Sequence, residues 1–246
     1  MIKDHRVFKP SRHKNRGRIF IFILKIIIVT LILQAIIPHF LISSYQVKSI
    51  SMEPAVTTGD RILVSPLNYG FFFPFSDKRI DGFQKPVRGE LVLINPPFEK
   101  KTRFPLSFLN GFIKLITLNI VNIDNSVPTP HIERIIGIPG DTVKVINHIA
   151  YIKTSNSDRF ISESELIRKK YTINIDSTLN RDEWENEYLI SGNLNEIILN
   201  KDEYFVLGDN RTASNDSRSW GKVGYSNILS KIFLRYFPFK KIGIPK

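Results

Sequence analysis

The longest apolar segment of the chain lies near its N-terminus. Residues 19–42 carry a single charged side chain, Lys25. A helix needs about 20 apolar residues to span the hydrocarbon core of a bilayer, and a lysine near one end can extend its ammonium group back to the headgroups. A cleaved signal peptide fits less well, because its apolar core is about 7–15 residues long. The pattern therefore predicts a transmembrane anchor over residues 19–42.

Short apolar runs separated by turn residues fill the rest of the chain. They are rich in Ile, Val, Leu and Tyr and end at Gly, Pro, Asn or Asp, which is typical of strands. The runs lie at 61–67, 89–97, 133–141, 142–146, 150–154, 196–200 and 203–210. No long segment with a helical period follows the anchor. We predict a mainly β, antiparallel domain over residues 43–246.

Several segments break the strand pattern. Residues 68–75 contain four Phe and one Tyr, and residues 104–123 are apolar but carry Lys114. Both could belong to the core, or they could lie at a membrane surface. We expect long insertions at about 98–130 and 155–195, of which the second is polar and is predicted to be solvated.

The distribution of charge changes how the net charge is interpreted. The 246 residues include 35 Lys and Arg against 23 Asp and Glu, a net charge of +12. Residues 1–42 hold eight of the basic residues and one acidic residue, so they supply +7 of this excess. A basic tail over 1–18 that precedes an apolar span predicts a cytoplasmic N-terminus and an extracytoplasmic domain. It also removes the main argument for nucleic-acid binding.

The chain has no cysteine, which excludes disulfides, thiolate zinc sites and cysteine nucleophiles. Three short motifs carry the other candidate chemistry. Residues 47–60 place Ser49 and Ser51 directly after the anchor, and residues 131–141 read as a strand that runs into a Pro-Gly-Asp turn. Residues 208–221 contain two Asp, two Arg and several hydroxyl groups. So many polar groups are unfavourable to bury unless they bond to one another, which predicts a hydrogen-bonded platform beneath a site.

In this order and after an N-terminal anchor, the motifs resemble those of bacterial type I signal peptidases, the membrane-bound serine endopeptidases of family S26. Residues Ser49–Asp60 are similar to the family's nucleophile box, and Arg88–Ile94 are similar to its RGDxVVF box. Residues Gly208–Gly221 are similar to the family motif GDNRxxSxDSRxWG. The resemblance implies a signal-peptidase-like β fold and cleavage of signal peptides from exported preproteins at a bacterial inner membrane. The sequence shows no metal or nucleotide motif, so no cofactor is expected.

The resemblance also implies a role for each site residue. A serine hydroxyl is a poor nucleophile until a base takes its proton. Ser51 would be the nucleophile, and the Ser51 N–H with the Ser49 hydroxyl would hold the oxyanion. The supporting residues would be Ser214, which orients the base, and two ion pairs that keep the strands in register, Arg134–Asp209 and Asp216–Arg218.

One position departs from the family pattern. The family uses a lysine base, whose amine is kept neutral by burial, and its position is held here by Glu133. Arg134 and the Pro-Gly-Asp turn at 139–141 fix this alignment. A shift by one residue would put Arg134 there, and arginine cannot act as a base near neutral pH.

Three hypotheses about the base follow. Glu133 could itself be the base if burial raised its pKa from about 4.3 by ~2–4 units. His131 could be the base: residues i and i+2 of a strand share a face, so His131 and Glu133 could form a Ser–His–Glu relay. The chain could instead be a catalytically impaired homologue that binds or regulates without cleaving. An extended substrate would pair with a strand edge near residues 47–51 or 131–137.

Overall fold

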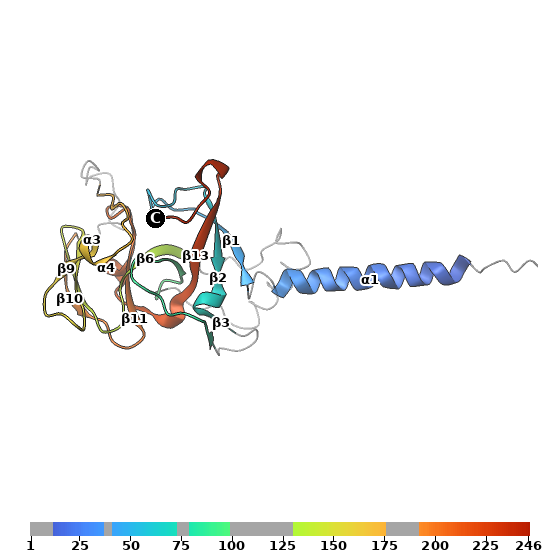
Figure 1. Cartoon of the computed structure of the whole chain (residues 1–246), viewed down its shortest axis with the longest axis horizontal. Coiled ribbons are helices and arrows are strands. Elements are labelled where there is room, and N and C mark those ends of the chain that lie inside the picture. The colour runs from blue at the N-terminus through green and yellow to red at the C-terminus, as the bar shows by residue number, and fades with distance from the viewer. Residues whose placement is uncertain (1–11, 37–40, 73–78, 99–129, 176–191) are drawn as a thin grey trace, which may run out of the picture.

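The computed structural model describes residues 12–36, 41–72, 79–98, 130–175 and 192–246. Helix α1 (Arg12–Ile36) lies apart from the β domain that follows it (Figure 1). It begins at Arg12, earlier than the apolar segment predicted from residue 19. Among the described residues, no helix is both long and apolar enough to cross a membrane.

The β domain contains three sheets in which the neighbouring strands pair antiparallel. The largest has the order β1 (Ser43–Gln46), β2 (Arg61–Ser65), β13 (Ile228–Phe237), β5 (Leu91–Ile94), β6 (His131–Gly137), β11 (Glu203–Leu207) and β12 (Val223–Gly224). The second has the order β10 (Leu194–Ile198), β7 (Thr142–Ile146), β8 (Ile149–Lys153) and β9 (Ile161–Ser162), and the third pairs β3 (Gly70–Phe72) with β4 (Arg79–Asp81). Two one-turn α-helices and three 3₁₀ turns join them: α3 (Glu163–Leu166), α4 (Ser217–Trp220), η2 (Pro66–Asn68), η3 (Tyr225–Asn227) and η4 (Phe239–Lys241).

The predicted mainly β, antiparallel fold is confirmed, and each predicted run overlaps a strand. The prediction missed β13, the strand of ten residues that pairs with both β2 and β5. In this strand Ile228, Ser230 and Ile232 are all buried. A serine on the buried face interrupts the alternation of apolar and polar residues from which strands are predicted.

Strand β6 lies where three groups of buried apolar side chains meet. Ile132 packs with the β1–β2 end of the large sheet, Ile135 with the β11–β12 end, and Ile136 with the second sheet. The residues between them, Glu133 and Arg134, are also almost completely buried. The strand of the second motif is therefore held in place by apolar packing on several sides.

Part of the insertion predicted at 155–195 is not solvated, so the expectation was wrong for some of its described residues. Glu163 is 0% exposed and Ile167 is 4% exposed, and Asn174 forms a parallel bridge with Asn210 of the third motif. Of the aromatic segment 68–75, Tyr69 is completely buried and belongs to the core.

Other predictions made for the irregular segments concern residues that the structure does not describe. Residues 73–78, 99–129 and 176–191 lie outside the described part of the chain. The apolar segment 104–123, and with it Lys114, falls within the second of these ranges.

Candidate active site

The loop at 47–60 carries the predicted nucleophile between well-anchored neighbours. The Val47 N–H donates a hydrogen bond of 2.9 Å to the Asp60 carbonyl, which closes the loop at its base. Met52, next to the serine, is only 1% exposed. The Ser51 N–H donates to the Ser49 hydroxyl at 3.1 Å. The two predicted oxyanion donors are therefore adjacent. In this contact the Ser51 N–H is used, whereas the Ser49 hydroxyl keeps its own proton for donation.

The third motif holds the backbone of the nucleophile loop. The Asn210 N–H donates to the Ser51 carbonyl at 2.9 Å, and the Asn210 side-chain amide donates to the Ile50 carbonyl at 3.3 Å. A Cβ atom at Gly208 would lie 2.1 Å from the Ser214 hydroxyl and 2.7 Å from the Ser51 carbonyl oxygen. Only glycine allows this close approach. Gly208 therefore lies against both Ser214 and Ser51.

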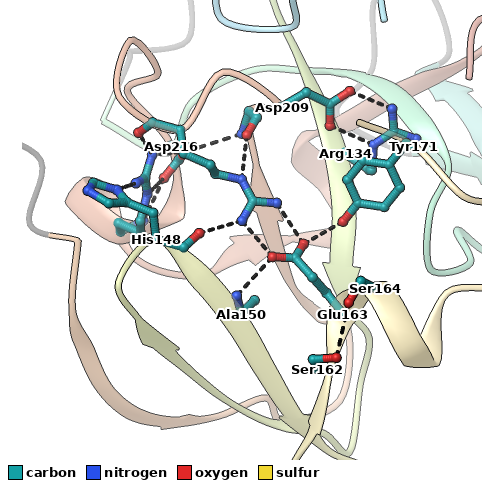
Figure 2. Close-up of polar contacts among 12 residues, drawn as sticks. Arg134, His148, Ala150, Ser162, Glu163, Ser164, Tyr171, Asp209 and Asp216 are labelled. Carbon is teal, nitrogen blue, oxygen red and sulfur yellow. Dashed lines mark hydrogen bonds and ion pairs between the residues drawn. The ribbon is translucent and has the colours of Figure 1, made fainter. Parts of the chain in front are cut away.

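Beneath this contact lies the buried polar platform expected from the sequence (Figure 2). Arg134 donates to Asp209 through Nε at 2.7 Å and Nη2 at 2.5 Å. Arg218 donates to Asp216 through Nε at 2.9 Å and Nη2 at 2.8 Å. The Ser214 hydroxyl donates to Asp216 at 2.9 Å. Both ion pairs implied by the resemblance are thus present, with two hydrogen bonds in each.

Glu133 lies inside the protein. Its side chain is 0% exposed, and neither carboxyl oxygen accepts a hydrogen bond from the described residues. Burial raises the pKa of the Glu133 carboxyl well above its ordinary value; Asp216 and Asp209 add to this rise and Arg218 opposes it. These effects favour the protonated acid, which cannot take a proton from a serine.

A cleft opens beside the nucleophile, and its lining includes Lys48, Ser49, Ser51 and His131. Glu133 is not among the described residues that line it. Burial lowers the pKa of His131 below its ordinary value, which favours the neutral imidazole. Of the two residues considered as replacement bases, the one that shares the cleft with Ser51 is therefore His131.

Comparison with known proteins agrees with this geometry. Residues 20–237 match the family described as signal peptidase, peptidase S26. The chain belongs to this family. Its relatives include a probable signal peptidase I-2 from Synechocystis sp., 26% identical over 220 residues, 89% of this chain and 74% of the relative. A signal peptidase I from Buchnera aphidicola subsp. Baizongia pistaciae is 29% identical over 240 residues, 87% of this chain and 76% of the relative.

Among solved structures, a signal peptidase I from Enterococcus faecalis V583 is 18% identical, covers 60% of this chain and 97% of its own, and has a TM-score of 0.32. The prediction that this is a type I signal peptidase family member, made from the three motifs, is confirmed. The roles of the individual site residues stay predictions.

Several polar residues of this family member's platform were not predicted from the sequence. Glu163 binds Arg211 with two contacts of 2.6 Å, and the Tyr171 hydroxyl donates to the same carboxylate. His148 Nδ1 lies 3.1 Å from Nη1 of Arg218. Glu163 and Tyr171 come from the insertion interpreted as solvated, where no motif or apolar period marks them.

Proposed function

We propose that this chain is a membrane-bound serine endopeptidase that removes N-terminal signal peptides from exported proteins, with Ser51 as the nucleophile. The observation that carries the proposal is the hydrogen bond from the Asn210 N–H to the Ser51 carbonyl. It joins the predicted nucleophile to the motif that holds Ser214. The relatives are named signal peptidases, which favours this function over that of an impaired homologue.

In this proposal His131 is the general base. It lines the same cleft as Ser51, and the lowered pKa of its imidazole supplies the neutral form that accepts a proton. The Ser51 Oγ attacks the scissile carbonyl carbon while its proton moves to the imidazole. The imidazolium then returns that proton to the leaving amine, and water hydrolyses the acyl-enzyme by the same route.

The neutral form of Glu133 supports this scheme electrostatically. The tetrahedral intermediate carries a negative charge, which the Ser51 N–H and the Ser49 hydroxyl would hold. A carboxylate nearby would repel that charge, whereas a protonated acid would not. The raised pKa of Glu133 therefore makes the substitution compatible with an oxyanion site, although it leaves the carboxyl group unsuited to act as the base.

The proposed location is a bacterial inner membrane, with the N-terminus in the cytoplasm and the β domain outside. The apolar residues 19–42 and the basic tail before them support the anchor and its orientation. At the other end of the chain, Phe239 is 75% exposed beside the two exposed lysines Lys240 and Lys241. Exposed aromatic and basic side chains are typical of segments at a lipid surface.

The proposal is tested with detergent-solubilised full-length protein and a preprotein substrate. Wild type should release the signal peptide, whereas Ser51→Ala and His131→Ala should not. Ser219→Ala, at an exposed serine of the third motif, controls for the loss of a hydroxyl and should cleave normally.

Other outcomes of the same experiment correct the proposal in defined ways. Cleavage by His131→Ala at the wild-type rate would show that His131 is not the base. An inert wild type together with an active Glu133→Lys variant would identify the chain as an impaired homologue. Cleavage by Ser51→Ala would refute the nucleophile.

A further inference from the structure

The carboxylate of Glu163 is completely buried and fully bonded. Its Oε1 accepts a hydrogen bond of 2.6 Å from Nη1 of Arg211 and one of 2.8 Å from the Ala150 N–H. Its Oε2 accepts a hydrogen bond of 2.6 Å from Nη2 of Arg211 and another from the Tyr171 hydroxyl. Figure 2 shows this carboxylate with its bonds to Ala150 and to the Tyr171 hydroxyl. A planar, two-point contact between a guanidinium and a carboxylate fixes orientation as well as position.

The contact fixes Arg211 within the third motif, next to the residue that holds the nucleophile loop. Nε of Arg211 donates to the Gly208 carbonyl at 2.8 Å, so the guanidinium bonds Glu163 and its own backbone turn together. The residue before it, Asn210, binds the Ser51 carbonyl at 2.9 Å. A shift of Arg211 would therefore move the peptide group that positions Ser51.

The same insertion bonds the third motif at two further points. The Asn174 N–H donates to the Asp209 carbonyl, and the Asn174 carbonyl accepts from the Arg211 N–H, both at 2.8 Å. The Tyr171 ring lies under the guanidinium of Arg134, with the guanidinium carbon 4.0 Å from the ring centroid. The insertion thus contacts both the backbone of the third motif and one of its ion pairs.

We propose that Glu163 and Tyr171 are positioning residues for the proposed peptidase reaction, acting through Arg211 and Arg134 to set the place of Ser51. The two residues are called the clamp below. The inference rests on the proposed function, because it assigns the clamp a purpose in that site. A displacement of about 1 Å of a reacting group can cost about 100-fold in rate, so small losses of alignment at the clamp should be measurable.

The test uses full-length protein with the substitution Glu163→Gln. Glutamine keeps the size of the side chain. Its NH₂ group, however, would replace a carboxylate oxygen that accepts hydrogen bonds in the wild type, so two donors would face each other. We expect kcat to fall about 10- to 100-fold while KM changes by less than about threefold, because the clamp does not touch substrate. Hydrogen exchange of peptides that cover residues 208–214 should become faster, since the Asn210 and Arg211 amides lose alignment.

Asp141→Asn is the matched control. Asp141 is also a buried carboxylate, 1% exposed, and it pairs with an arginine, Arg88, but its described bonds lie outside the third motif. It should lower the melting temperature without the change in kcat or in the exchange of residues 208–214. Tyr171→Phe is a second, milder variant, which keeps the ring against Arg134 and should change kcat and exchange in the same direction as Glu163→Gln.

The inference is overturned if both clamp variants match Asp141→Asn in kcat and in the exchange of residues 208–214. Hydrogen exchange separates this failure from that of the proposed function. If the wild type cleaves nothing but Glu163→Gln still accelerates exchange around Asn210, the clamp holds the motif and the peptidase proposal alone fails.

Discussion

Replacing Glu133 with glutamine should make the protein's stability less sensitive to pH. The carboxyl group is 0% exposed and has no hydrogen-bond partner among the described residues. Its folded-state pKa is raised by burial and by Asp216 and Asp209. In the unfolded chain the same group ionises with a pKa of about 4.3. The folded state therefore binds this proton more tightly than the unfolded state does.

The sign and size of the effect follow from proton linkage. The stability due to the raised pKa is complete below about pH 4.3 and is lost as the pH rises towards the folded-state pKa. Within that window the free energy of unfolding falls by about 1.4 kcal/mol per pH unit. For a domain of this size 1 kcal/mol corresponds to about 2–4 °C, so the wild type should lose roughly 3–6 °C per pH unit from this group. Glutamine does not titrate and removes that slope.

The assay is thermal unfolding of wild type and Glu133→Gln at several pH values from 5 to 8. The difference in melting temperature, variant minus wild type, should grow with pH until the folded-state pKa of Glu133 is reached, whatever its value at pH 5. Glu165→Gln, at an exposed carboxyl group, should show no such trend. Parallel curves for wild type and Glu133→Gln would refute the claim that Glu133 is protonated in the folded protein.

Three further predictions concern the platform and the cleft. Asp209→Asn leaves the buried guanidinium of Arg134 without its carboxylate and should lower the free energy of unfolding by about 3 kcal/mol in urea titrations. A loss below about 0.5 kcal/mol, the size of a typical surface effect, would contradict this. Ser49→Ala removes a proposed oxyanion donor and should reduce kcat about 100-fold with little change in KM, and an unaltered kcat would exclude that role. Lys48→Glu reverses the charge of a residue that lines the cleft. When an acidic and a basic peptide compete for cleavage, the ratio of their cleavage rates should shift about fivefold towards the basic peptide relative to wild type, or ~1 kcal/mol. An unchanged ratio would show that Lys48 does not contact substrate.

Much of the site could be predicted from the sequence because its motifs are local. The Ser49–Ser51 spacing and the dense polar residues of 208–221 can be read without knowing the fold. The Arg134–Asp209 and Asp216–Arg218 pairs followed from the family resemblance, and the structure contains both. Glu163 could not be found in this way, because a buried carboxylate and a solvated one look the same in a polar segment.

The sequence by itself determined the family and where most strands lie, since strand periodicity and turn residues are properties of neighbouring positions. Only the tertiary structure decided the chemical state of the altered base position. The protonation of Glu133 depends on its burial and on the charges of Asp216 and Asp209, which the chain brings back from far along the sequence. The fold likewise decided that His131 lines the cleft beside Ser51. Electrostatic free energies depend on distance and solvent exposure in space, and neither can be read from spacing along the chain.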